Sequence, residues 1–255
     1  MYDLPDLERF VQVRPGLWRC TIIWAVAYGI ECPVATFLVD SGAPTQVERL
    51  LKAIDVVFTH ANDTLRYICI THAHIDHTGA APALLEKYPQ AKAVMHVEEK
   101  PFICHGKSLK TVQSDTWTFS IMKHLGHDAD VKLPEDRVIA LRDGDKWEFD
   151  HVIKFVETPG HTPGSSSFIH IPSRSILVGD AVMNIAANPL WSKIPCISGP
   201  MAMSTCHWGN AMEAITKICS LKDEVDTVFP AHDYSMDGIH ITKVHEFHHP
   251  HGSSN

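Results

Sequence analysis

A short segment of this sequence holds four side chains of the kinds that bind metal ions. His72, His74, Asp76 and His77 fall within six residues, directly after the apolar run 67–70. In an extended segment alternate side chains point to the same side, so His72 and His74 could bind one cation while the next two side chains reach a second. Imidazole nitrogen and carboxylate oxygen are ligands for zinc, iron and manganese. The spacing therefore predicts a metal centre.

The rest of the chain makes chance clustering a poor explanation, although 18 of the 255 residues are histidine. Three later strand-like runs each lead to a possible ligand, namely His161, Asp180 and His232. In layered α/β proteins the strand ends meet along one edge of the sheet, where loops can build a cleft. The side chains would then form two cages. One cage is His72, His74 and His161, the other is Asp76, His77 and His232, and Asp180 would bridge them.

The elements that must position these side chains follow from the hydrophobic periodicity. The runs that precede the ligands are expected to be strands: 67–70, 152–156, 175–179 and 225–231. Further strands are expected within 11–40 and at 92–97, and helices at 44–54, 79–88 and 207–221. Residues 137–151 resemble a hairpin that turns at 142–145. No linker or repeat divides the chain.

Together these motifs resemble those of the metallo-β-lactamase superfamily, over roughly residues 30–235. The first motif has the form HxHxDH, and the later histidine, aspartate and histidine follow in the family's usual order. Residues 36–42 are similar to the family's early strand and its Asp-x-Gly turn, and residues 158–165 to its PGHTxGS segment. The resemblance implies an α/β fold, a four-layer αββα sandwich with two facing sheets, outer helices and a shallow metal groove at the sheet edge.

Length and hydrophobic content are sufficient for one domain, since 255 residues that are 45% hydrophobic can bury a substantial core. We expect a single domain over residues 1–240, with a lid-like insertion at about 98–133 and a flexible, His-rich tail at 241–255. Some apolar residues of the insertion could form a wall over the metals, or could be buried within an inserted helix pair. They are Phe102, Ile103, Trp117, Phe119, Ile121 and Met122. Three nearby histidines are expected at the surface: His105, His124 and His127.

Charge and composition exclude several classes of protein. A net charge of −8 argues against a general nucleic-acid binder. No stretch is long enough to span a membrane, and the acidic N-terminus is unlike a secretory signal. Seven cysteines without a CxxC pair suit a reducing compartment. We therefore expect a cytoplasmic protein whose partner is a small-molecule substrate, with neither nucleic acid nor membrane involved.

The predicted cages indicate hydrolysis. Two divalent cations about 3.5–4 Å apart can share a water molecule and lower its pKa to near 7, which generates a bridging hydroxide nucleophile. Zinc is the expected metal, and iron or manganese would fit the same ligands. Asp76 could also steer the water or carry its proton. Asp40 either orients a ligand or caps its own turn, Ser41-Gly42.

The resemblance narrows the choice of substrate. Class B1 β-lactamases have a cysteine where Asp180 stands, which speaks against a zinc penicillinase. Acyl-homoserine lactonases share the ligand set, so a lactone or carboxylic ester, with an acyl chain as one possibility, is the leading prediction. Many lactonases carry a substrate-contacting tyrosine where this chain has Met183. Other candidate donors are Tyr234, Asn184 and His207.

Two alternatives on the same fold stay open. A glyoxalase II-like thioesterase would need a helical glutathione-binding region after the last ligand, and only 23 residues follow His232. An iron-dependent persulfide dioxygenase-like enzyme would use a single iron bound by two histidines and an aspartate. Flavodiiron proteins typically carry glutamate where His74 stands, and a non-catalytic metal site is disfavoured because all the expected ligands are present.

Overall fold

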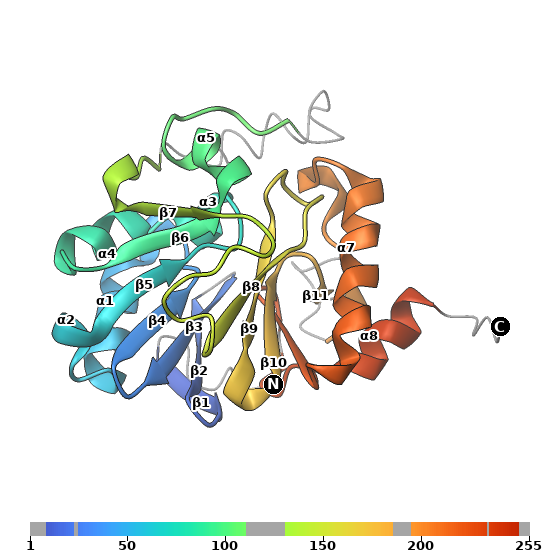
Figure 1. Ribbon diagram of the computed structural model, residues 1–255, viewed down its shortest axis with the longest axis horizontal. Coiled ribbons are helices and arrows are strands. Elements are labelled where there is room, and N and C mark those ends of the chain that lie inside the picture. The colour runs from blue at the N-terminus through green and yellow to red at the C-terminus, as the bar shows by residue number, and fades with distance from the viewer. Residues whose placement is uncertain (1–8, 23–24, 111–130, 186–194, 234, 250–255) are drawn as a thin grey trace.

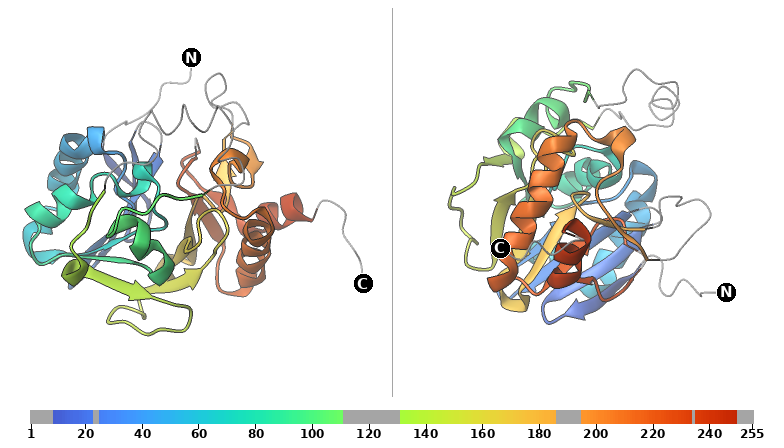
Figure 2. Two further views of the ribbon diagram at one scale, coloured as in Figure 1. Left: turned by 90° about the horizontal axis from the view of Figure 1, so that it is seen from above. Right: turned by 90° about the vertical axis from the view of Figure 1, so that its right-hand side faces the viewer.

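Two β-sheets pack face to face, and helices cover the outer face of each. The computed structural model describes residues 9–22, 25–110, 131–185, 195–233 and 235–249. Figure 1 shows the layers in order, with α1 and α4 outside one sheet and α7 and α8 outside the other, and both views in Figure 2 agree. The fold is therefore the predicted four-layer αββα sandwich.

In the described residues the first sheet has seven strands in sequence order. Strands β1 to β4 form an antiparallel meander, and β4 to β7 run parallel to one another. Their bounds are β1 (Phe10–Arg14), β2 (Leu17–Ile22), β3 (Ala25–Cys32), β4 (Ala35–Val39), β5 (Leu65–Cys69), β6 (Lys92–His96) and β7 (Val138–Leu141). The helices between these strands are α1 (Val47–Val57), α2 (Ala61–Thr64), α3 (Ile75–Thr78), α4 (Ala81–Lys87) and α5 (Lys100–Ile103).

The second sheet has the order β14-β13-β10-β9-β8 within the described ranges. Its strands are β8 (Ile153–Glu157), β9 (Ser166–His170), β10 (Ser175–Gly179), β13 (Thr227–Pro230) and β14 (Ile239–His240). A small ribbon pairs β11 (Met183–Asn184) with β12 (Ile197–Ser198). The outer helices are α7 (Trp208–Ser220) and α8 (Ile241–His248).

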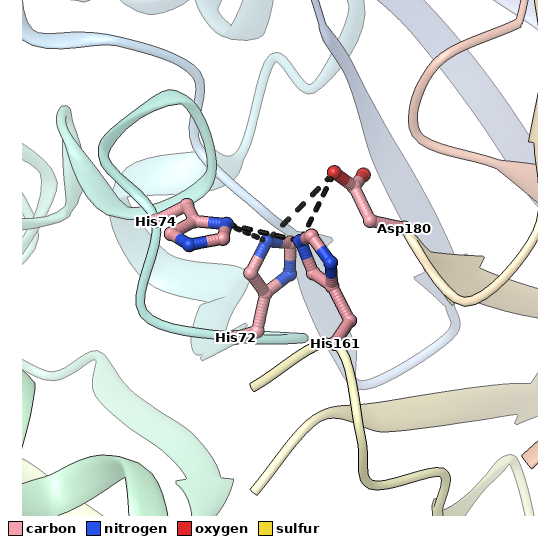
Figure 3. A group of neighbouring side chains, drawn as sticks. All are labelled: His72, His74, His161 and Asp180. Atoms are coloured by element: carbon pink, nitrogen blue, oxygen red, sulfur yellow. Dashed lines mark hydrogen bonds and ion pairs between the residues drawn. The ribbon is translucent and has the colours of Figure 1, made fainter. Parts of the chain in front are cut away.

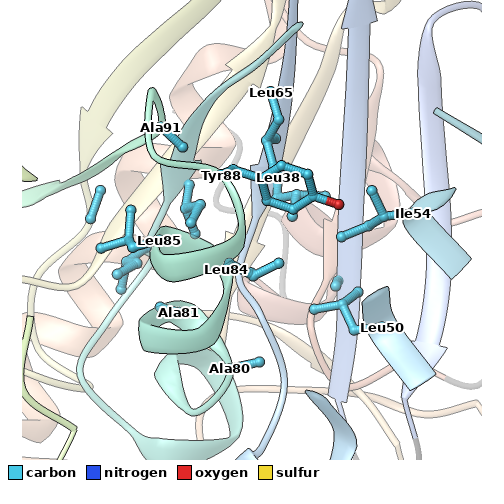
Figure 4. Close-up of a cluster of buried hydrophobic side chains, with 14 of the residues drawn as sticks. Leu38, Leu50, Ile54, Leu65, Ala80, Ala81, Leu84, Leu85, Tyr88 and Ala91 are labelled. Atoms are coloured by element: carbon cyan, nitrogen blue, oxygen red, sulfur yellow. The ribbon is translucent and has the colours of Figure 1, made fainter. Parts of the chain in front are cut away.

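Three apolar clusters hold the layers together. Phe37, Phe168 and Phe229 belong to the cluster between the two sheets, and each is fully buried. Outside the first sheet, α1 and α4 bury residues such as Leu50 and Leu84 against the strands (Figure 4). Outside the second sheet, α7 does the same with a helical stripe of apolar side chains. Both faces of both sheets thus contribute to the apolar core. The polar side chains of the predicted ligands collect at the edge of the sheets where the strands end.

All four strands that precede predicted ligands end at that edge. β8, β10 and β13 run parallel, so their carboxyl ends lie together. β5 ends at the same edge in the first sheet and leads into α3. The predicted ligands therefore come from both sheets and meet where the sheets adjoin.

Two sequence expectations are wrong in detail. Of the hairpin expected at 137–151, only β7 forms; Phe149 instead packs between the sheets, so its burial reflects core packing rather than strand pairing. The tail expected to be flexible from residue 241 is helical in its first part, because Ile241–His248 form α8 and Val244 is fully buried.

The expected insertion is described only in part. Ile103 is buried in the cluster beneath the helices of the first sheet, which fits core packing rather than a wall over the site. His105 is half exposed and its Nε2 lies 3.3 Å from Glu135 Oε1. Phe102 lies in α5 and is partly buried. The remaining expected wall residues and histidines lie outside the described residues: Trp117, Phe119, Ile121, Met122, His124 and His127. Nowhere in the described ranges is a helix long and apolar enough to cross a membrane.

Candidate metal centre

The first motif is divided between a loop and a short helix. β5 ends at Cys69, and the following extended segment carries His72 and His74. Helix α3 begins directly after His74, and its first turn carries Asp76 and His77. The change from extended to helical backbone sends the two pairs of side chains to neighbouring positions, as the spacing predicted.

The first cluster is formed by three imidazoles and a carboxylate (Figure 3). His74 Nδ1 lies 3.0 Å from His72 Nε2 and 3.0 Å from His161 Nε2. Asp180 Oδ2 lies 3.4 Å from His161 Nε2 and 4.0 Å from His72 Nε2. All four side chains are buried, and the facing atoms converge on one point.

The second cluster consists of Asp76, His77 and His232. Asp76 Oδ2 lies 3.3 Å from His232 Nε2 and 3.6 Å from His77 Nε2. Asp180 Oδ1 completes it, at 3.4 Å from His232 Nε2 and 3.3 Å from His77 Nε2. Asp180 thus directs one oxygen to each cluster.

The residues fit divalent cations on two counts. The facing atoms within each cluster lie within 4.8 Å of one another. His77 Nε2 and Asp180 Oδ1 are buried and have no hydrogen-bond partner. An unsatisfied buried polar atom costs about 1–3 kcal/mol, a cost that a coordinated cation would remove. The two clusters could therefore hold metal ions.

The histidine pKa values of the two clusters are shifted in opposite directions. Burial, together with the neighbouring histidines, holds the pKa of His72 well below its usual range, and burial lowers that of His161 to about 4. Burial also lowers the pKa of His77, but nearby carboxylates outweigh it and raise the value to about 9. Asp180 and Asp76 likewise raise the pKa of His232 against the effect of burial. Burial thus favours neutral imidazoles in the first cluster, whereas the carboxylates favour protonated imidazoles in the second.

Asp40 supports both clusters from below. Its Oδ2 accepts a hydrogen bond of 2.8 Å from His77 Nδ1, and its Oδ1 accepts one of 2.8 Å from the Thr71 backbone N–H. The Thr71 hydroxyl also donates to Asp40, so it accepts from His72 Nδ1 at 3.0 Å. Both histidines thereby direct Nε2 toward the other side chains of their clusters. Of the two roles expected for Asp40, orienting a ligand is the one observed.

Thr205 performs a similar role for the third histidine. Its hydroxyl donates to the Met201 carbonyl at 2.8 Å and lies 3.2 Å from His161 Nδ1, from which it can accept. The Cys206 backbone N–H donates to the His161 carbonyl at 2.8 Å. Sequence reasoning missed Thr205, because it lies 44 residues from His161 in an irregular stretch without a motif.

The four positions considered for contact with substrate differ in availability. Met183 is 3% exposed and Asn184 is 5% exposed, so neither faces solvent. The Asn184 amide donates to Asp233 Oδ1 at 2.7 Å and is already used. His207 is exposed and begins α7, where its Nδ1 accepts from the Asn210 backbone N–H at 3.1 Å. Tyr234 lies outside the described residues.

Known proteins resemble this chain in both sequence and fold. A family model described as the metallo-beta-lactamase superfamily matches residues 34–232. A probable metallo-hydrolase of Bacillus subtilis (strain 168), YflN, is 27% identical over 89% of this chain and 87% of its own length. An archaeal metallo-beta-lactamase superfamily protein, ST1585 from Sulfolobus tokodaii, has a TM-score of 0.60 and 21% identity, and the match covers 98% of this chain and 86% of that one. BJP-1, a subclass B3 metallo-beta-lactamase of Bradyrhizobium japonicum, has a TM-score of 0.61 and 18% identity, covering 91% and 80%.

Proposed function

The chain belongs to the metallo-beta-lactamase superfamily, and from that premise we propose that it is a metal-dependent hydrolase of lactones or carboxylic esters. The observation that carries the proposal is the position of Asp180 between the two clusters. Its Oδ2 faces His161 Nε2 and its Oδ1 faces His232 Nε2, each at 3.4 Å. A shared carboxylate suits two divalent cations, with zinc as our first choice and iron or manganese compatible with the same donors.

When bound, the cations would supply Lewis acidity, which lowers the pKa of a water molecule to near 7 and polarises a carbonyl oxygen. The chain's own residues would hold and move the remaining charges. Asp76 is the more exposed of the two carboxylates in the clusters, at 19% against 8% for Asp180. Solvent and substrate therefore reach Asp76 more readily. We assign it to accept the proton that the attacking water loses.

His207 is our candidate for the donor to the substrate carbonyl. A backbone N–H can donate only to an unprotonated ring nitrogen, so the hydrogen bond from Asn210 to Nδ1 leaves the ring proton on Nε2. The preceding residue, Cys206, is bonded to the His161 carbonyl, which keeps His207 beside the loop of a candidate ligand. Asn184 is less suitable because it is buried and its amide already donates to Asp233, and Met183 has no hydrogen to donate.

The experiment that tests the proposal is a substrate panel of acyl lactones, aryl esters, thioesters, phosphotriesters and a cephalosporin, with metal content measured on the same sample. We expect lactones or esters to be cleaved and His74→Ala to be inactive. His105→Ala is the matched control, because His105 is a half-exposed histidine paired with Glu135. Preferential cleavage of thioesters would instead favour a glyoxalase II-like enzyme. A single bound iron with no hydrolysis would favour oxygen-dependent sulfur chemistry.

A second variant on the same panel tests His207. Asn is a good helix N-cap, so His207→Asn keeps the start of α7 and removes the imidazole N–H. Removing one donor to a developing oxyanion typically costs about 10²–10³ in kcat. We expect a loss of that order with metal content unchanged, and an unaltered kcat would remove His207 from the proposal.

The partner that suits such a site is a small-molecule substrate rather than nucleic acid or a membrane. The seven cysteines all lie in the described residues as free thiols. Free thiols are typical of a reducing compartment, and we propose the cytoplasm as the location.

A further inference from the structure

Glu99 is a fully buried carboxylate beside the candidate metal centre that the proposed chemistry does not use. It ends the short 3-10 turn Val97–Glu99, which directly follows β6 of the seven-stranded sheet. A glutamate is seldom fully buried unless specific donors hold it. Its partners therefore indicate its role.

Those partners lie in the loop that follows His161, which belongs to the other sheet. Glu99 Oε1 accepts a hydrogen bond of 2.8 Å from the Thr162 hydroxyl and one of 2.7 Å from the Gly164 backbone N–H. Burial raises the pKa of Glu99 to about 7, whereas the Thr162 and Gly164 donors favour its charged form. Glu99 ends the turn after β6, and β6 pairs in parallel with β5, the strand that leads to His72 and His74. Its carboxylate therefore joins the His161 loop to the part of the first sheet that supplies the other two histidines.

The packing around these bonds is close. A Cβ atom on Gly164 would lie 2.7 Å from His96 Nδ1 and 3.0 Å from the Glu99 backbone nitrogen. No side chain larger than hydrogen fits there without movement of the Glu99 turn. The Ser166 backbone N–H also donates to the Thr71 carbonyl at 2.9 Å, which joins the His161 loop to the loop of His72 and His74.

We propose that Glu99 is a positioning residue that clamps the His161 loop to the end of β6, beside the strand that leads to His72 and His74, and so pre-forms the first cluster. His72 and His74 follow β5 of one sheet, and His161 follows β8 of the other. Their ring nitrogens meet only if the two loops are held in register. The second cluster depends less on Glu99, because its contribution from the second sheet, His232, follows β13 and not the clamped loop. This inference rests on the metal binding in the proposed function.

The test is a zinc titration of the full-length protein against a competing chelator, followed by NMR of the histidine ring nitrogens, so that His161 and His232 report separately. Glu99→Leu removes both carboxylate oxygens while the side chain keeps a similar size. Glu99→Gln keeps one acceptor, as an amide oxygen. Loss of a partner that orients a metal ligand typically lowers affinity about 10–100-fold. We expect that loss at His161 in Glu99→Leu, a change below about twofold at His232, and substantial recovery in Glu99→Gln.

Two further variants distinguish loss of the clamp from general destabilisation of the protein. Glu98→Gln is the matched control, because Glu98 is exposed and pairs with Arg142 at 3.3 Å; it should titrate as the wild type does. Thr162→Val removes one donor from the opposite side, so it should weaken zinc binding at His161 even if Glu99→Leu does not fold. Equal weakening at both histidines, or none at either, would overturn the clamp. A wild type that binds no zinc would overturn the metal proposal itself, and the clamp with it.

Discussion

The two clusters share Asp180 but are built differently. The first joins three imidazoles that are at most 5% exposed, and the partners of His72 and His161 are the neutral hydroxyls of Thr71 and Thr205. The second contains Asp76 and has the charged partner Asp40, and its His232 side chain is 13% exposed. One cluster is therefore held by close packing and the other by charge.

This difference indicates how each cluster would receive a cation. In the first, low pKa values leave His72 and His161 neutral, so their nitrogens are ready to coordinate. In the second, the carboxylates attract a cation but also raise the pKa values of His77 and His232. A metal ion entering there must displace protons. Preorganisation favours metal binding at the first cluster, and electrostatic attraction favours metal binding at the second.

Replacing Asp180 should have the largest effect, because it removes the side chain that both clusters share. Asp180→Asn keeps the size of the side chain but weakens the ligand that both share, so we expect metal loss at both. The loss should exceed the roughly 10–100-fold typical of an outer partner. Metal content after dialysis measures it, with the exposed Asp226→Asn as control. Loss at only one cluster would show that Asp180 does not bridge.

Replacing Asp40 should affect the second cluster more than the first. Asp40 adopts a left-handed backbone with φ of 61°, which asparagine tolerates, so Asp40→Asn changes the charge without straining the turn. Without its carboxylate partner, His77 should bind zinc about 10–100-fold more weakly. The first cluster should lose less, because it contacts Asp40 only through Thr71. A larger loss at the first cluster, measured by the same site-resolved titration, would contradict this comparison.

The pH dependence of zinc binding should also distinguish the clusters. The pKa of His77 is raised to about 9, so below that pH a proton must leave as the metal binds. Each proton released makes affinity rise about tenfold per pH unit, and the second cluster should bind more tightly as pH increases from 6 to 8. The first cluster should be nearly flat over that range, because the pKa of His161 is about 4. Calorimetry in buffers of different ionisation enthalpy counts the protons; equal release at both clusters would refute the difference.

The smallest effect is expected for Thr205→Val. The substitution removes the acceptor for His161 Nδ1, which lies 3.2 Å away, and keeps the side-chain shape. A neutral hydrogen bond contributes about 0.5–1.5 kcal/mol, which corresponds to roughly a 2–10-fold weaker first cluster. Site-resolved titration beside Asp40→Asn shows whether a neutral partner matters less than a charged one. An effect as large as that of Asp40→Asn would argue against the distinction.

The sequence predicted which side chains meet at the edge of the sheets, because strand ends are local features. His72, His161, Asp180 and His232 each follow an apolar run that does form a strand, and parallel strands bring their carboxyl ends to one edge. The sandwich itself was expected from the resemblance of these motifs to a known family. Periodicity identified α1, α4 and α7 to within a few residues but missed α2, α8 and the buried strand β9.

The supporting residues could not be predicted, because their partners are distant in sequence. Glu99 contacts Thr162 across 63 residues, and Thr205 contacts His161 across 44 residues. Neither Glu99 nor Thr205 lies in a recognisable motif. The sequence pattern predicted a hairpin strand at Phe149, but this residue is buried by packing between the sheets. The high histidine content of the tail predicted a flexible segment where α8 forms, although Ile241 and Val244 are buried there. Pattern reasoning identifies the side chains at strand ends, and tertiary contacts decide what holds them.

We propose that these side chains hold two metal ions on either side of Asp180. Anomalous diffraction from zinc-loaded crystals, recorded above and below the zinc absorption edge, tests it most directly. We predict two peaks, one among His72, His74 and His161 and the other among Asp76, His77 and His232, with Asp180 between them. A single peak, or zinc bound elsewhere, would contradict the account.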